Sequence, residues 1–391
     1  MITISGTRAL RRDIALATAT STAIGYTYAA HGPVLPLVTA EFGLSDIQAG
    51  LIATALFLMA AATMVLFSDL ADRYPTRGAV TFGLALVLAG NVATGLAPSY
   101  PALLAAKAVG GLGAGFGFLA GLRYIQLRYA GARAHFGQGL YGAGYPLGSL
   151  IGLWVMPTLA VAWGWRGAFL ATSAALAIVV LAWRLATALP RTRRPGNMLD
   201  AASCWNCWAL LIQHAAGFGL IFAAATWITT FLVREFGLPL EAGGLLGSLL
   251  LLLAVVARPI GGYLVAREHV STLAVMRAAQ LTVLAGIALV ALPGRPLAAA
   301  LAGAVLLGVG GGLPYAPVFI TAAASLPRAP GASQGLAALG GLLGTLVGAP
   351  AMGFANQTWG FSQAWLILGA LSLTAFAITF AMRGEEDLAP G

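Results

Sequence analysis

Twelve apolar runs, most of them about 20 residues long, divide the chain between short polar segments. A run of that length crosses the hydrocarbon core of a bilayer as an α-helix, because in lipid each backbone polar group must find its partner within the segment. The runs do not alternate between apolar and polar residues, as the strands of a membrane barrel would. We therefore predict an all-α membrane protein with twelve transmembrane helices. The runs are 14–38, 48–67, 79–97, 101–122, 135–158, 166–188, 205–232, 242–265, 272–292, 297–321, 333–355 and 362–382.

The composition agrees with this prediction, because hydrophobic residues make up 59% of the chain and charged residues only 8%. Soluble domains carry roughly 25% charged residues. The net charge of +9 does not indicate nucleic-acid binding, since the arginines lie mostly in the polar segments between the runs. With a cytoplasmic N-terminus the outer segments carry only Arg166, Arg234 and Arg295, and this bias places both termini in the cytoplasm. The first run is long and has no small-residue cleavage site, so we expect a protein of the bacterial inner membrane without a cleaved signal peptide.

The longest polar connection, LPRTRRPGNMLDAAS at 189–203, separates two sets of six runs. The two halves share sequence, since EFGLSDIQAG at 41–50 corresponds to EFGLPLEAGG at 235–244, 194 residues further on. Two six-helix repeats around a central site are typical of carriers that expose the site alternately to the two sides of the membrane. We predict two pseudo-symmetric six-helix bundles. The predicted parts are an N-terminal bundle at 1–188, a cytoplasmic linker at 189–204 and a C-terminal bundle at 205–391.

The loop after the second run, SDLADRYPTRG at 68–78, resembles a signature of the major facilitator superfamily, and the likeness extends over essentially the whole chain. The resemblance implies the twelve-helix major facilitator fold. It also implies a gate at the cytoplasmic mouth, formed by Asp72, Arg73 and Arg77. A carboxylate near helix ends and two guanidinium groups can close the mouth in one state and separate in the other. The matched positions are Leu70, Asp72, Arg73 and Arg77, while Ser68 and Pro75 replace the usual glycines.

A second segment, LAAKAVGGLGA at 104–114, resembles the helix 4 signature of the same family. Lys107, the single lysine of the chain, stands in the position of the family's arginine, and Gly111 and Gly113 match. Gly110 replaces a glutamine. The helix 5 signature typical of drug antiporters is only weakly matched by GLYGAGYPLGSLIG at 139–152, which counts against drug efflux.

Lys107 and Arg258 are the cations that lie deepest inside predicted helices, whereas every acidic residue lies in a loop, at a helix end or in a tail. At a rise of about 1.5 Å per residue, Lys107 lies about 9 Å from the outer end of helix 4 and Arg258 about 12 Å from the inner end of helix 8. An uncompensated cation at such depth costs at least a few kcal/mol, so the expected counter-charge is an anionic substrate held between the two cations. Two alternatives stay open, namely that Arg258 extends to the inner headgroups and that Lys107 is structural or part of a gate.

Aromatic and polar residues lie on the helices that line the central cavity in that family. The segment GVGGGLPYAPV at 308–318 predicts a break in helix 10, which is tolerable only beside a cavity. For a tyrosine or a histidine in a membrane helix, packing or helix contact is the alternative to substrate binding. Besides Lys107 and Arg258, the candidate substrate-binding residues are Tyr26, Tyr28, His31, Tyr141, Tyr145, His214 and Tyr315.

These features predict a secondary transporter that moves a small anion, either a carboxylate or an inorganic ion such as nitrate or cyanate, by rocker-switch alternating access. It would act as an exchanger, a uniporter or a symporter. The alternative is an exporter of drugs or amphipathic metabolites, which would need an acid at mid-membrane. We expect no enzymatic activity and no cofactor, because the sequence shows no nucleophile–base, metal or phosphate-loop constellation. Cys204 and Cys207 lack the further ligands that a metal or redox site needs, so we expect no metal site. The expected partners are the anionic substrate, the lipid bilayer and a coupling ion or counter-substrate; we expect a monomer and no nucleic acid.

Overall fold

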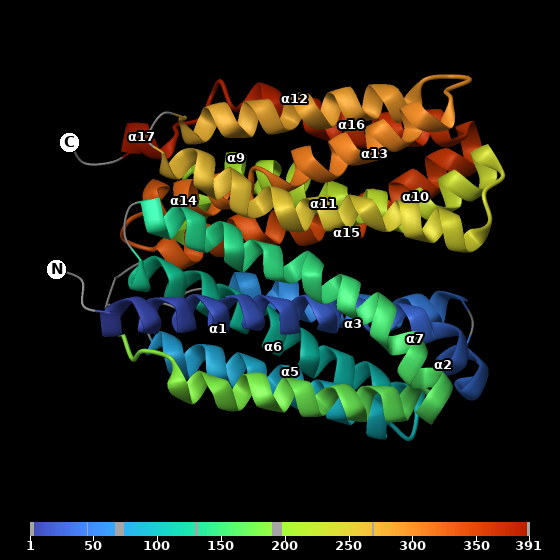
Figure 1. Ribbon diagram of the computed structural model, residues 1–391, viewed down its shortest axis with the longest axis horizontal. Helices are drawn as coiled ribbons and strands as arrows, with labels where there is room; N and C mark the ends of the chain where they lie inside the picture. The colour runs from blue at the N-terminus through green and yellow to red at the C-terminus, as the bar shows by residue number, and fades with distance from the viewer. Residues whose placement is uncertain are drawn as a thin grey trace. The chain divides into compact units, whose positions relative to one another are not determined.

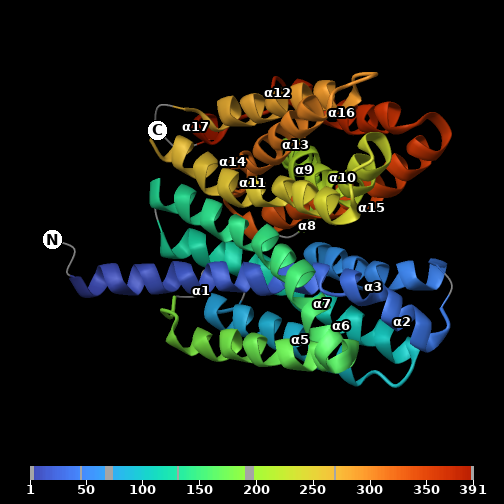
Figure 2. The same cartoon turned by 45° about the vertical axis from the view of Figure 1, so that its right-hand side comes forward.

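The computed structural model describes residues 4–44, 46–66, 74–129, 132–189, 198–267 and 270–388, and the regular elements in these ranges are helices. The chain forms two compact units (Figures 1 and 2). The first unit comprises Met1–Tyr129 and Ala143–Pro195, and the second comprises Ala130–Gly142 and Gly196–Gly391. The start of one long helix therefore groups with the second unit. The predicted boundaries at 188 and 205 stay a prediction.

Within its described residues, the first unit contains five long helices, the last of which turns sharply. Gly164 has a φ of 68°, a backbone conformation that glycine adopts without strain, so the 51-residue α7 consists of two helices. The elements of this unit are α1 (Ile4–Ala29), η1 (Gly32–Val34), α2 (Leu35–Phe42), α3 (Asp46–Leu66), α5 (Thr76–Leu96), α6 (Tyr100–Arg128), most of α7 (Ala132–Ala182) and η2 (Trp183–Leu185).

Glycines bring α6 into close contact with α5 and α3. A Cβ atom on Gly90 of α5 would lie 2.5 Å from the backbone nitrogen of Gly110 on α6. The two glycines that match the helix 4 signature act in the same way, because a side chain on Gly111 would collide with Leu56 of α3, and one on Gly113 would collide with α5. Small residues let membrane helices pack with their backbones close together, which gives the signature a structural reason.

The second unit contains two irregular helices. The π-helix η3 lies between α9 and α10, and Leu313 and Pro314 separate α13 from α14. The predicted break in helix 10 is thus confirmed. The elements of this unit are α8 (Met198–Ala202), α9 (Trp205–His214), η3 (Ala215–Gly219), α10 (Leu220–Phe236), α11 (Leu240–Ala266), α12 (Thr272–Ala291), α13 (Leu297–Gly312), α14 (Tyr315–Ser325), α15 (Pro330–Trp359), α16 (Phe361–Ile378) and α17 (Glu385–Leu388).

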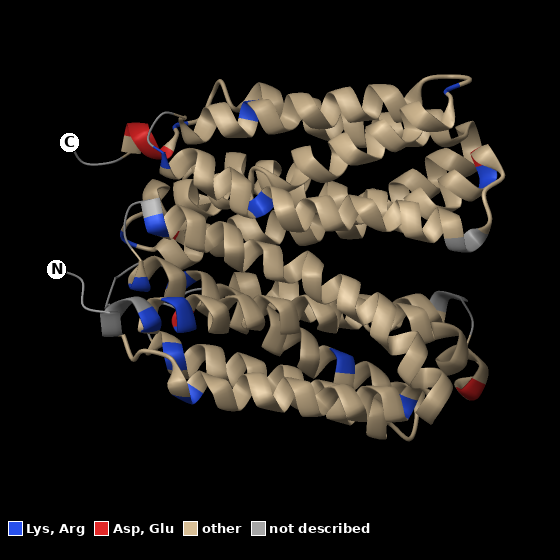
Figure 3. Ribbon diagram, viewed as in Figure 1, with Lys and Arg blue, Asp and Glu red and all other residues tan. Residues whose placement is uncertain are grey.

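The protein is a multi-pass membrane protein with twelve transmembrane helices, as predicted. Within the described residues, 10 helices are long and apolar enough to cross a membrane. The longest candidate, Arg133–Leu185, is divided at Gly164 and supplies two crossings, and α1 with the short helices after it supplies another. In each unit, Lys and Arg residues gather at the end of the helices where a chain terminus lies (Figure 3).

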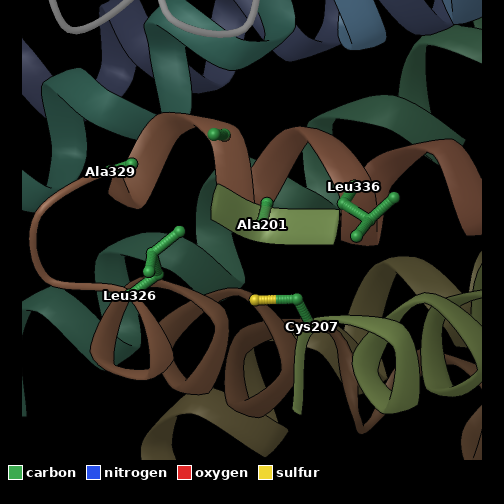
Figure 4. Close-up of a cluster of buried hydrophobic side chains, with 6 residues drawn as sticks. Ala201, Cys207, Leu326, Ala329 and Leu336 are labelled. Atoms are coloured by element: carbon green, nitrogen blue, oxygen red, sulfur yellow. The ribbon is translucent and has the colours of Figure 1, made fainter. Parts of the chain in front are cut away.

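The two cysteines lie at the start of α9, and both are free thiols. Cys207 belongs to a buried hydrophobic cluster (Figure 4), and its sulfur lies 3.3 Å from the Ser333 hydroxyl. The cluster joins α8, α9, the end of α14 and the start of α15. Its buried members are Ala201, Cys207, Leu326, Ala329, Ala332 and Leu336.

Near the start of α1, the fully buried carboxylate of Asp13 joins three elements of the first unit. It accepts hydrogen bonds from Arg128 Nε at 2.6 Å, from Arg12 Nη2 at 3.1 Å and from the Thr187 backbone N–H at 3.2 Å. Burial by itself raises the pKa of Asp13, but the hydrogen bonds from Thr187 and Arg128 outweigh burial and hold the pKa below its ordinary value. The contact fastens the end of α6 and the segment after η2 to α1.

Two glutamates at equivalent positions of the repeats accept hydrogen bonds from arginines. In each unit the glutamate lies at the end of the helices away from the cluster of Lys and Arg residues (Figure 3). Glu41, at the end of α2, pairs with Arg166 in the second part of α7. Glu235, at the end of α10, pairs with Arg295 Nη2 at 2.8 Å. Arg295 precedes α13, and its Nη1 also donates to Ser362 of α16 at 3.0 Å. The acceptor is shared by the repeats, whereas the donor comes from a different element in each.

Candidate functional site

Lys107 is a buried cation in the first unit. It lies in the first half of α6 with 4% of its surface exposed, and its Nζ lies 4.2 Å from the ring centroid of Phe169 on α7. Among the described residues, no hydrogen bond or ion pair of its ammonium group is found. A cation–π contact contributes about 0.5–2 kcal/mol, which does not offset the cost of at least a few kcal/mol for a charge within the membrane. This part of the chain therefore leaves Lys107 without a counter-charge.

His31 and Tyr28 bring buried polar atoms to the same unit. His31 follows α1 and lies close enough to Lys107 for an electrostatic interaction. Within the described ranges, His31 Nδ1 and the Tyr28 hydroxyl have no hydrogen-bond partner. The Tyr28 ring contacts Phe57 and Tyr145, with centroid distances of 4.8 and 5.3 Å. Buried polar atoms without partners are rare, so these two are suited to bind a ligand.

Tyr26, by contrast, has hydrogen-bond partners within the unit. Its hydroxyl lies 2.6 Å from Thr172 Oγ1 on α7. Asn91 of α5 donates to the same threonine at 3.3 Å and to Ser173 at 2.9 Å. These contacts connect α1, α5 and α7, so packing accounts for the position of Tyr26.

Arg258 is the buried cation of the second unit, with 1% of its surface exposed. It lies on α11, and its Nη1 donates to the backbone carbonyl of Gly142 at the start of α7. Its guanidinium carbon lies 4.7 Å from the ring centroid of Tyr315 and 5.5 Å from that of Phe218. A side chain at Gly139 would collide with the Arg258 carbonyl, so the absence of one lets α7 approach α11 here. Arg258 is enclosed by the protein and does not extend to the headgroups.

Arg258, His214 and Tyr315 line a small pocket in the second unit. His214 Nδ1 lies 3.0 Å from the Ala337 carbonyl, whereas His214 Nε2 and the Tyr315 hydroxyl have no hydrogen-bond partner among the described residues. The π-helix η3 begins directly after His214 and places Phe218 in the pocket wall. Such π-helical turns are frequent at functional sites. These residues thus bring a cation and two buried polar atoms together around a space too small to hold a water molecule.

The remaining candidates are two tyrosines of α7, which belong to different units, and the three predicted gate residues. Tyr141 is fully buried and belongs to the second unit, as Tyr315 does, whereas Tyr145, one turn further along α7, belongs to the first. Of the predicted gate, Asp72 and Arg73 lie outside the described residues. Arg77 Nη1 donates to the carbonyl of Ala186 at 3.3 Å. The gating role of these three residues stays a prediction.

The fold agrees with the comparison to known proteins. Residues 17–339 match the family model described as Major Facilitator Superfamily. The chain belongs to this superfamily. A solved structure of the proton:xylose symporter XylE superposes with a TM-score of 0.80 over 96% of each chain, and at 13% identity this likeness shows the fold alone.

Two similar proteins carry names that refer to small anions. The probable nitrate/nitrite transporter NarK2 of Mycobacterium tuberculosis is 30% identical over 344 residues, which cover 80% of this chain and 81% of that protein. The probable nitrate/nitrite antiporter NarK1 of Thermus thermophilus is 29% identical over 243 residues, covering 57% of this chain and 54% of that protein, about half its length. Membership of the superfamily indicates a transporter rather than an enzyme.

Sequence reasoning missed three features of the site. The rings of Phe169 and Phe218 contact the cations in addition to the ring of Tyr315, which was predicted, and the Gly142 carbonyl accepts a hydrogen bond from Arg258. Apolar aromatic residues are common in membrane helices, and a backbone carbonyl has no signal in the sequence. The glycines around Phe218 in AAGFG at 215–219 could have indicated an irregular helix.

Proposed function

We propose that the protein is a secondary transporter that carries a small anion across the bacterial inner membrane by rocker-switch alternating access, with both termini in the cytoplasm. The observation that carries this proposal is the burial of Lys107 without a counter-charge in the described part of the chain. A carrier of cations would need a negative site, whereas a buried cation is stabilised by an anionic ligand. The names of the two relatives support the same sign of charge.

Each unit supplies a cation and polar side chains to this proposed function. Lys107 and Arg258 neutralise the anion, while His31, Tyr28 and the corresponding groups in the second unit provide hydrogen bonds and set the size of the anion. Asp72, Arg73 and Arg77 form the cytoplasmic gate. The full set of proposed substrate-binding residues is Lys107, Arg258, Tyr28, His31, Tyr141, Tyr145, His214 and Tyr315, with Tyr26 in a packing role.

The test is the thermal stability of the purified protein in detergent with nitrate, nitrite, acetate and succinate, and with organic cations and neutral drugs as controls. A ligand that binds only the folded protein raises its melting temperature. We expect one of the anions to stabilise the wild type, and Lys107→Ala and Arg258→Ala to abolish the shift. Arg184→Ala, at an exposed arginine of η2, is the matched control and should keep it. Stabilisation by organic cations or neutral drugs alone, unchanged in both variants, would instead indicate the exporter.

A further inference from the structure

The coupling ion of this transporter follows from the chemistry of its single lysine. We propose that a proton is the coupling ion and that Lys107 carries it, being neutral in the empty transporter and taking up one proton together with the anion. This inference rests on the proposed function, which it extends by naming the ion that drives transport and the residue that binds it.

Lys107 differs from the other cationic side chains in that it can lose its proton. The others are arginines, and a guanidinium group stays protonated in proteins. A lysine ammonium gives up its proton when it is buried without a counter-charge, because desolvation penalises the charged form. Lys107 meets this condition, since it is 4% exposed and no described residue forms an ion pair with it.

The groups that face Lys107 permit its neutral form. After α1 the facing group is the imidazole of His31, and from α7 it is the ring of Phe169. The only charged residue of α5 is Arg77 near its start, and α3 has no charged residue after Asp46. The charged residues of α1 lie in its first half. No described carboxylate therefore stabilises the protonated form of Lys107. The anion that binds becomes the group that stabilises this charged form.

Arg258 has the complementary property, because its charge is permanent. Its guanidinium group donates to the Gly142 carbonyl and lies against the rings of Tyr315 and Phe218. A permanent cation attracts the anion throughout the cycle. The protonation state of Lys107, by contrast, determines whether the empty transporter carries an additional positive charge when it returns across the membrane.

The cycle balances in atoms and in charge. On the uptake side, Lys107 Nζ accepts a proton from water as a monovalent anion binds. On the release side, the anion leaves and Nζ returns its proton to water. One proton and one anion cross in each cycle, so transport is electroneutral. The net charge of the loaded transporter, protein and bound anion together, then equals that of the empty transporter, and neither step moves an uncompensated additional charge through the membrane.

The first test uses the fact that the chain has a single lysine. Lysine labelled with carbon-13 at Cε gives one NMR signal, which Lys107→Arg abolishes and thereby assigns. In the folded, anion-free protein we expect this signal to move between about pH 6 and about pH 9, whereas in protein unfolded in dodecyl sulfate it stays in the protonated position, as an exposed lysine does. A signal that keeps the protonated position to about pH 9 in the folded protein overturns the inference, whichever anion the protein binds.

The second test measures transport of nitrate into proteoliposomes with an internal pH dye. We expect nitrate uptake to be accompanied by proton entry and driven by an inward proton gradient. Lys107→Arg should lose net uptake more strongly than nitrate–nitrate exchange, since exchange needs no return of the empty protein, and Arg184→Ala should lose neither. Net uptake of nitrate by the wild type without proton entry overturns the coupling but supports anion transport. If nitrate does not enter at all, nitrate is excluded from the proposed function, and the NMR signal still decides the protonation of Lys107.

Discussion

The buried contact of Asp13 provides the most quantitative test of how the first unit is held together. Asp13→Ala removes the acceptor of Arg128 Nε at 2.6 Å and of the Thr187 N–H at 3.2 Å. A hydrogen bond to a charged group contributes about 1.5–3 kcal/mol, and a buried charge left without its partner adds to the loss. Since 20% of the Arg128 side chain is exposed, water relieves part of this loss. We expect Asp13→Ala to lower the free energy of unfolding by about 2–4 kcal/mol.

The control is Asp200→Ala, which breaks another aspartate–arginine pair. There the Arg328 side chain is 61% exposed and that of Asp200 29%, and an exposed pair contributes about 0–1 kcal/mol. Unfolding by dodecyl sulfate titrated into mixed micelles, followed by tryptophan fluorescence, measures both variants. If Asp13→Ala is no less stable than Asp200→Ala, the reasoning from burial is refuted.

The same contact predicts a pH dependence with a definite sign. The pKa of Asp13 lies below its ordinary value in the folded protein, so its contribution to stability is complete above the unfolded value of about 3.9 and is lost as the pH falls through the folded value. The difference in stability between wild type and Asp13→Ala should stay constant from about pH 8 to about pH 5 and shrink only below about pH 4. A difference that shrinks already between about pH 7 and about pH 5 would contradict the lowered pKa.

Two further predictions concern packing. Gly90→Ala should destabilise the protein by more than about 2 kcal/mol in the same unfolding assay, because the new methyl group would lie 2.5 Å from the backbone of Gly110, whereas Gly78→Ala meets nothing within 4 Å and should be close to neutral. Equal stability of the two variants would contradict the close contact of α5 and α6. In the folded protein, a maleimide should modify Cys204 and leave Cys207 unmodified, because Cys207 is fully buried in its cluster. Mass spectrometry of peptides detects the difference, and rapid modification of Cys207 would argue against that packing.

The transmembrane helices were predictable because lipid imposes one solution on a long apolar run, namely a helix with its own hydrogen bonds. The break at Pro314 was predictable for a related reason, since proline lacks the N–H group that a continuous helix needs. The burial of Lys107 and Arg258 also followed from their place within apolar runs. These properties depend on residues that are near one another in the chain.

The partners of the site residues were not predictable, because they depend on how distant helices face one another. Arg258 and Gly142 are 116 positions apart, and nothing local to either indicates the contact. Tyr26 illustrates the same limit, since its type and position suited substrate binding, but a hydroxyl group from Thr172 already satisfies it. The direction of a side chain around its helix decides between these roles, and apolar sequence on all sides of a helix leaves that direction undetermined.

The glutamate contacts at the ends of α2 and α10 bear on how far the two repeats remain interchangeable. Glu41 and Glu235 occupy the same position of the repeat, but Arg166 and Arg295 come from different parts of it. A chimera that exchanges the segments carrying the glutamates keeps an acceptor in both places. A chimera that exchanges the segment with Arg166, or the segment with Arg295, for its counterpart in the other half leaves one glutamate without its arginine. The other half then carries two arginine donors. The segments that carry the glutamates are therefore interchangeable between the two halves, whereas each arginine donor is specific to its own half.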